Sequence, residues 1–190
     1  SEVPKYQLMV MNPVSKKQFT FAPVDTFTVA DKGTKIAFIA GGKDSTRLKS
    51  LVVFDPVRQS SDTLVRDSLI FRRLTLDENG TQLAFLASGD TAAVKNYALY
   101  YSPLHTSKVI KAVDSLTVGM PAKWSPSVNE GLLFSKDGTK LFFGTAALSH
   151  RSPKDSVLED EKPKLDVWSY TDAPIQPRQL NQLSVRKKQT

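Results

Sequence analysis

Apolar runs joined by glycine-containing turns occur three times along this chain, at residues 26–42, 73–89 and 131–147. Each copy holds an apolar run, a turn with Gly, a Thr, a Lys or Gln, and a second apolar run that ends in small residues. Asn79-Gly80 and Asp137-Gly138 are strong signals for a two-residue loop, because Gly and Asn reach positive φ at little steric cost. The pattern therefore predicts three β-hairpins with tight turns.

The second strand of each hairpin is apolar at successive positions rather than at alternating ones, at residues 36–40, 83–87 and 141–143. Such strands are normally covered on both faces. Their tight turns make them antiparallel, and the chain offers no amphipathic helical stretch to cover them. We therefore expect small antiparallel sheets stacked face to face around an axis, which is the architecture of a β-propeller.

The strand and turn signals divide the chain into units of propeller-blade length. The fold class predicted is all-β, a single partial β-propeller arc of about three complete four-stranded antiparallel blades plus a partial one. Its terminal strands would expose unpaired backbone groups, so an edge-strand homodimer is also expected. The predicted parts are a partial blade at 5–22, blades at 25–67 and 71–112, a linker at 116–130, a blade at 131–183 with an inserted loop at 149–164, and a basic tail at 184–190.

Composition excludes several classes of function. The net charge is +7, but Lys and Arg are scattered apart from Arg186-Lys187-Lys188, so no nucleic-acid binding is expected. The chain has no cysteine, which rules out disulfides and thiolate metal sites within it. No apolar run approaches the roughly 20 residues that span a bilayer, so no membrane span is expected.

The residues that carry chemistry are sparse. No G-x-S-x-G pentapeptide is present, and the two histidines, His105 and His150, lie far apart in predicted loops. Zinc needs three or four converging ligands, and the acidic residues of the inserted loop match no calcium-loop spacing. We therefore predict no catalytic, metal or cofactor residue in this chain.

Two features are candidates for contact with a partner or substrate. One is a tryptophan in the Pro-rich linker, because aromatic residues with a polar end are favoured at interfaces. The other is the long inserted loop, since such loops are often functional. The candidate contact residues are Trp124, His150, Arg151, Glu159, Asp160 and Glu161.

The sequence FSKDGTKLFFGTAA at 134–147, with KPKLDVWSYTDAPIQPRQLNQL at 162–183, resembles the N-terminal propeller of the prolyl oligopeptidase family of serine peptidases. It resembles above all the extracytoplasmic members with degenerate WD-like repeats. The FSxDGTKLxF pattern also resembles TolB-type propellers, whereas Asp166-Val167-Trp168 is more particular to the peptidases. The first two copies depart from the pattern, with Val29-Ala30 and Thr75-Leu76 interpreted as replacing the aromatic-Ser pair.

The resemblance implies a non-catalytic propeller segment that shapes substrate access to an α/β-hydrolase domain absent from this chain. The implied partners are that catalytic domain and, through it, a peptide substrate. The implied compartment is the periplasm or the exterior, although no signal segment is present in the chain. The alternative is a TolB-like or other secreted propeller that acts as a protein- or glycan-binding module without enzyme activity.

Overall fold

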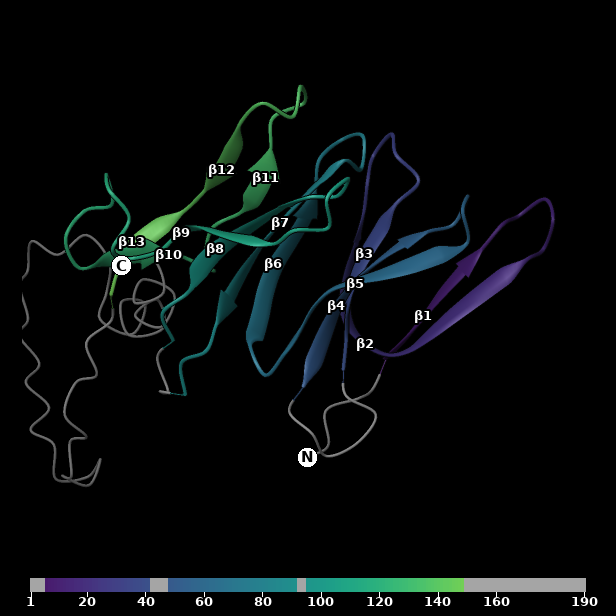
Figure 1. The fold of residues 1–190 in the computed structure, drawn as a ribbon, viewed down its shortest axis with the longest axis horizontal. Coiled ribbons are helices and arrows are strands. Elements are labelled where there is room, and N and C mark those ends of the chain that lie inside the picture. The colour runs from purple at the N-terminus through teal and green to yellow at the C-terminus, as the bar shows by residue number, and fades with distance from the viewer. Residues whose placement is uncertain (1–5, 42–47, 92–94, 149–190) are drawn as a thin grey trace, which may run out of the picture. The chain divides into compact units, whose positions relative to one another are not determined.

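The structure is a computed structural model that describes residues 6–41, 48–91 and 95–148 (Figure 1). Regular structure in these residues is entirely β, as the sequence pattern predicts. The strands are β1 (Tyr6–Met11), β2 (Gln18–Val29), β3 (Ile36–Ala40), β4 (Lys49–Asp55), β5 (Ser60–Asp67), β6 (Ile70–Leu76), β7 (Gln82–Ser88), β8 (Ala98–Pro103), β9 (Ile110–Val113), β10 (Trp124–Pro126), β11 (Leu132–Phe134), β12 (Leu141–Phe143) and β13 (Thr145–Ala147).

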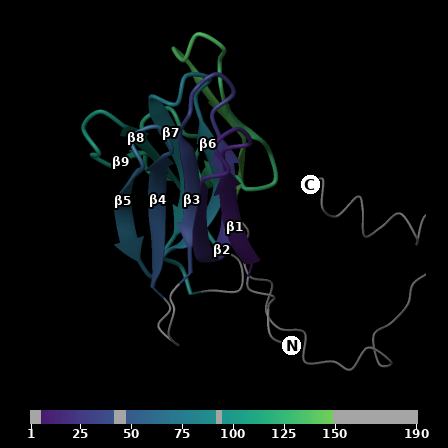
Figure 2. The same ribbon diagram turned by 90° about the vertical axis from the view of Figure 1, so that its right-hand side faces the viewer.

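All strand pairs are antiparallel, and in the first two sheets neighbouring strands pair in chain order. The first sheet has the order β1-β2-β3-β4-β5, and the second has the order β6-β7-β8-β9. Figure 2 shows the five strands of the first sheet side by side. Two short pairs, β11-β12 and β10-β13, follow the second sheet in the sequence and are called here the third sheet.

Consecutive side chains of the central strands belong to different cores. On β3, Ala37 and Ile39 pack in a core shared with the second sheet, whereas Ile36 and Phe38 pack in a core on the opposite face. The second sheet behaves in the same way, because Phe85 faces the first sheet and Leu86 shares a core with the third.

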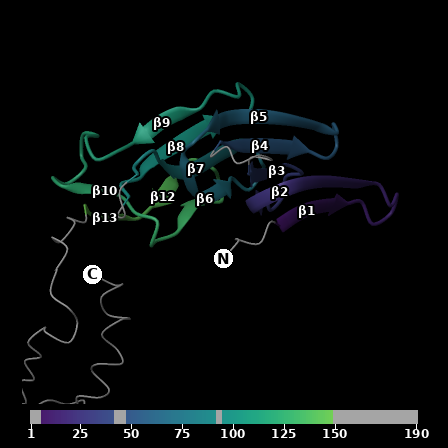
Figure 3. The same cartoon turned by 90° about the horizontal axis from the view of Figure 1, so that it is seen from below.

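Both faces of β3 and β7 are therefore covered, as predicted. β7 lies between the first and third sheets, whereas β3 lies between the second sheet and the β1-β2 hairpin of its own sheet. Figure 3 shows the second sheet between the first sheet and strands β10–β13. Small antiparallel sheets that follow one another face to face define a partial β-propeller arc.

The boundary predicted between a partial blade at 5–22 and a blade from residue 25 is wrong, because β2 runs through it without a break. The first half of β2 pairs with β1 and the second half with β3, and both registers shift between residues 21 and 26. Phe19 and Phe21 pack on Phe54 and Phe38, with ring centroids 5.0 and 4.7 Å apart. The chain thus passes from one layer to the next in an extended conformation.

The two-residue turns predicted for the hairpins are also wrong. Each turn is a four-residue loop closed by an N–H to C=O bond over five positions, from Ala30 to Lys35 (3.2 Å), Asp77 to Gln82 (3.1 Å) and Ser135 to Lys140 (2.9 Å). Gly80 and Gly138 have φ near +70° and +68°. Loops of this length are commonly built around a type I turn, and the left-handed residue that follows favours Gly.

The linker predicted at 116–130 is partly a strand. β10 pairs with β13, so Trp124 lies opposite Ala147, and β11 pairs with the adjoining β12. Residues 127–131 therefore form a loop between the short strands β10 and β11. Arg73 lies at a bulge in β6 and has a φ of +49°. Its Nε holds this loop by donating a hydrogen bond to the carbonyl oxygen of Val128 at 2.7 Å. Bulges of this kind redirect a side chain.

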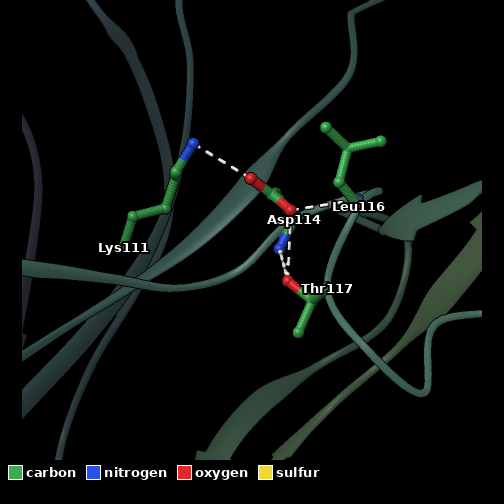
Figure 4. Close-up of polar contacts among 4 residues, drawn as sticks. All are labelled: Lys111, Asp114, Leu116 and Thr117. Carbon is green, nitrogen blue, oxygen red and sulfur yellow. Dashed lines mark hydrogen bonds and ion pairs between the residues drawn. The ribbon is translucent and has the colours of Figure 1, made fainter.

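A capped turn follows β9 and begins the segment before β10 (Figure 4). Asp114 accepts hydrogen bonds from the Leu116 N–H (3.0 Å) and the Thr117 hydroxyl (3.1 Å), and pairs with Lys111 Nζ at 2.9 Å. The hydrogen bond from Lys111 is the main cause that lowers the pKa of Asp114, followed by those from Leu116 and Thr117. The remaining predicted parts of the third blade, its inserted loop and the basic tail lie outside the described residues.

Candidate functional site

The three hairpin turns contact one another in series, and residues 30–35, 77–82 and 135–140 are called here the turn row. The N–H groups of Lys32 and Gly33 both donate to the carbonyl oxygen of Glu78, at 2.8 and 3.1 Å. Gly33 is required by this approach, since a Cβ there would collide with the backbone of Asn79. Gln82 Nε2 in turn donates to the carbonyl oxygen of Gly138 at 3.0 Å. The second turn thus joins the first turn to the third.

A buried carboxylate organises the second turn. Asp77 is 2% exposed, and its Oδ1 accepts the N–H groups of Thr81 and Gln82 at 2.6 and 2.7 Å. Its Oδ2 accepts the Thr81 hydroxyl at 2.8 Å. The amide oxygen of Gln82 accepts the Tyr101 hydroxyl at 2.7 Å, which ties the turn to β8. Each oxygen of the carboxylate therefore has a donor, as a buried charge requires.

The third turn is held by an exposed network of the same kind. Ser135 Oγ accepts the Lys140 N–H at 2.9 Å and donates to Asp137 at 2.5 Å. Asp137 also accepts the Thr139 hydroxyl at 2.7 Å. These bonds, the one from Ser135 first, stabilise the carboxylate and lower the pKa of Asp137 to about 2.

The pKa of Asp137 is expected to depend on the Ser135 hydroxyl. NMR titration of the carboxyl carbon should give a pKa of about 2 in the wild-type chain and a higher pKa in Ser135→Ala. Because the folded-state pKa is below the unfolded one, the stabilisation is complete above the ordinary carboxyl pKa and is lost as pH falls toward 2. Ser135→Thr keeps the hydroxyl and should keep the low pKa. An Asp137 pKa that is unchanged in Ser135→Ala would contradict this role.

A pocket of about 250 Å³ lies beside the turn row, between β2, β6 and β11, the first strands of the three hairpins, and is called here the inner-strand pocket. Its walls combine apolar side chains, hydroxyl groups and charges of both signs. Glu78 in the wall is paired with Lys32 at 2.9 Å. The lining residues are Thr28, Val29, Asp31, Thr75, Leu76, Glu78, Leu133, Phe134, Ser135 and Lys136.

The lining offers three kinds of group that can contact an extended chain. Hydroxyl groups can pair with its backbone, apolar walls can receive its side chains, and the charges of the wall can select its charge. No His or Cys is among the lining residues, so the pocket holds no imidazole or thiol for nucleophilic chemistry.

Of the contact residues predicted from the sequence, only Trp124 falls within the described ranges. It is 38% exposed and lies on β10, away from the residues that line the inner-strand pocket. Its neighbours Ser125 and Pro126 line a second pocket of about 290 Å³, but Trp124 itself does not. The other predicted contacts, His150, Arg151, Glu159, Asp160 and Glu161, lie outside the described residues. His105 lies in the exposed turn between β8 and β9.

Sequence reasoning missed the residues that hold the turn row. The sequence pattern matches Thr75-Leu76 to Phe134-Ser135. The structure instead matches Leu76-Asp77 to that pair, because the N–H groups of Asp77 and Ser135 make the bonds that close their loops. Counting back three positions from each turn glycine gives Ala30, Asp77 and Ser135. A side-chain acceptor at two of three equivalent positions is a signal for a capped loop.

Within residues 6–41, 48–91 and 95–148, no three acidic or histidine side chains are grouped to hold a metal ion. The same ranges contain no helix with the length and apolarity needed to cross a membrane.

No family model and no curated protein matches the chain. Among solved structures, it is similar to the β-propeller domain of the Trilobed protease from Pyrococcus furiosus, which has an open velcro topology. The two are 16% identical, with a TM-score of 0.45, over 55% of this chain and 33% of that one. This chain thus spans about a third of that structure.

The fold is assigned from the pairing and packing of the sheets in the described residues. Their antiparallel chain-order pairing and their shared cores define the chain as a segment of a β-propeller.

Proposed function

We propose that this chain is the non-catalytic propeller segment of an extracytoplasmic serine peptidase of the prolyl oligopeptidase family. In this role it narrows the approach to a catalytic α/β-hydrolase domain of the same parent polypeptide and contacts peptide substrate. The proposal is supported by the resemblance of residues 124–183 to that family and by the propeller arc. Its periplasmic or secreted location rests on the resemblance.

The observation that carries the proposal is the inner-strand pocket. The first strands of the three hairpins, β2, β6 and β11, all contribute to it. In a propeller the first strands line the central channel, so this wall is the surface that a peptide passing along the channel would meet. The exposed Lys136 adds a positive charge to the wall, and this charge attracts acidic side chains of a peptide in the channel.

Charge reversal in the pocket tests the proposal in the parent polypeptide. Lys136→Glu is expected to lower kcat/KM for acidic peptides by about threefold to tenfold, because it replaces an attractive charge with a repulsive one. Lys140→Glu is the matched control, since Lys140 is exposed in the same turn but lies outside the pocket lining. Equal effects of the two variants would exclude a role of the pocket in substrate access.

Labelling with a serine-directed fluorophosphonate separates the peptidase from a binding module. The parent should be labelled and should contain G-x-S-x-G after residue 190, whereas the isolated chain should take no label. A parent that holds further repeats but no labelled serine would favour the TolB-like protein- or glycan-binding module. Unchanged cleavage and assembly after deletion of residues 149–164 from the parent would remove the predicted role of that loop.

A further inference from the structure

The three hairpins contribute to the inner-strand pocket from equivalent positions. Counted back from the turn glycines, which are Gly33, Gly80 and Gly138, these are the fifth, fourth and second residues. Ser135 is the lining residue that falls outside this pattern. The fifth residues are Thr28, Thr75 and Leu133, the fourth are Val29, Leu76 and Phe134, and the second are Asp31, Glu78 and Lys136. The wall therefore consists of three rows, each of which crosses all three hairpins.

The row at the second position, called here the charge row, changes sign along the wall. Asp31 and Glu78 are acidic, whereas Lys136 is basic. Lys32, the residue before the first turn glycine, lies 2.9 Å from Glu78 and offsets its charge. The residue before the second turn glycine is Asn79, which has no charge to offset that of Lys136. Along the wall, the charge row thus runs from negative through neutralised to positive.

The other two rows are suited to the uncharged parts of a peptide. The row at the fourth position is apolar in all three hairpins, and Leu76 lies at its centre. At the fifth position, Thr28 and Thr75 offer hydroxyl groups to the N–H and C=O groups of a peptide backbone. Because the middle of the charge row is neutralised, the centre of the wall favours an apolar side chain over a charged one.

We propose that the inner-strand pocket selects peptides by the order of their charges. The matching segment places a basic side chain at Asp31, an apolar side chain at Leu76 and an acidic side chain at Lys136. This inference rests on the proposed function, because a peptide in the channel is the ligand that the proposed function supplies. It adds a substrate class, which is a segment with opposite charges on either side of an apolar centre.

The geometry of stacked sheets sets the distance between the two charges of such a peptide. Sheets that pack face to face are about 10 Å apart, so the first and third hairpins are separated by at most about 20 Å. An extended chain covers that distance in about six residues, and side chains an even number of residues apart point the same way. A basic and an acidic residue separated by about four or six positions therefore reach both ends of the charge row.

The order of charges should change the affinity by a moderate factor. Asp31 and Lys136 are both exposed, and exposed ion pairs are individually weak. Like charges placed opposite one another are unfavourable to a similar extent. A peptide that matches both ends of the charge row is therefore expected to bind about threefold to tenfold more tightly than one that matches a single end.

Fluorescence anisotropy with three labelled peptides tests the charge order on this chain. The peptides share an apolar centre and carry Arg and Glu, Arg at both ends, or Glu at both ends. At physiological ionic strength, a Debye length of about 8 Å screens the general attraction of acidic peptides to a chain with a net charge of +7. The wild-type chain should bind the peptide with Arg and Glu about threefold to tenfold more tightly than either of the others.

Charge reversal at either end of the row should change which peptide binds best. Asp31→Lys is expected to prefer the peptide with Glu at both ends, and Lys136→Glu the peptide with Arg at both ends. The double variant should again prefer the peptide with Arg and Glu, which can bind it in the reverse direction. Asp62→Lys and Lys140→Glu are the matched controls, since they make the same changes in net charge at exposed residues outside the lining of the inner-strand pocket.

Three results would each overturn the inference: no binding of the peptides, equal affinities of all three peptides, or equal shifts in the pocket variants and the control variants. None of these readouts needs a catalytic domain, so they are separate from the tests of the proposed function. A parent that takes the fluorophosphonate label would keep its peptidase assignment in each case. An unlabelled parent would remove that assignment without changing these affinities.

Discussion

Phe85→Ala is expected to produce the largest loss of stability among single substitutions considered for this chain. Phe85 is 1% exposed in the core between the first and second sheets. Its ring stacks on Tyr100 at 5.2 Å and lies 5.7 Å from Phe71. Truncation of a buried Phe to Ala removes its transfer free energy and leaves a cavity, which together cost about 3–5 kcal/mol. Urea unfolding at equilibrium measures this loss.

The matched control for Phe85→Ala is Phe142→Ala. Phe142 lies on the second strand of the third hairpin, as Phe85 does in the second hairpin, but it is half exposed. Its truncation should therefore lower the free energy of unfolding by less than about 1 kcal/mol. Equal losses in the two variants would mean that the first and second sheets are not packed around Phe85.

Asp77→Ala is expected to produce the second large loss, of roughly 2–4 kcal/mol, because it leaves two backbone N–H groups without an acceptor in a partly buried turn. The groups affected are the N–H of Thr81 and the N–H of Gln82, which Asp77 Oδ1 accepts. Gln82 also donates to the third turn, so the loss should extend to the contact with Gly138. Hydrogen exchange of the Thr81 and Gln82 amides reports the local effect, and thermal unfolding reports the total.

Two variants make the test of Asp77 specific. Asp77→Asn keeps one acceptor oxygen and should retain part of the stability, whereas Asp77→Ala should not. Asp137→Ala removes a carboxylate from the exposed third turn and should have a much smaller effect, since water can replace its bonds. If Asp77→Ala and Asp137→Ala were equally mild, the buried carboxylate would have no special role in the turn row.

Much of the fold is readable from local patterns. The three hairpins, their chain order and the double burial of β3 and β7 follow from apolar runs such as Ile36–Ala40, because hairpins pair nearby residues. The size of the turns was not readable in the same way. Asn79-Gly80 satisfies the signal for a two-residue loop, but bonds from Thr81 and Gln82 to the carboxylate of Asp77 stabilise a four-residue loop instead.

Sequence reasoning selected other residues than those that line the inner-strand pocket, and its selection stays a prediction. It selected Trp124 and the loop at 149–164, because exposed aromatic residues and long loops are common contact sites. The inner-strand pocket draws on Val29, Leu76 and Leu133, which are about 50 residues apart in the sequence and meet only because the sheets stack. No local pattern marks residues whose proximity depends on that stacking.

The sequence by itself determined which side chains share a face, since successive residues of a strand point to opposite sides of its sheet. The tertiary structure alone decided which faces are covered. Ala84 and Phe142 occupy equivalent positions, yet one is fully buried and the other is half exposed. The physical reason is that burial depends on the sheet that packs opposite, and the described residues supply such a sheet for Ala84 but not for Phe142.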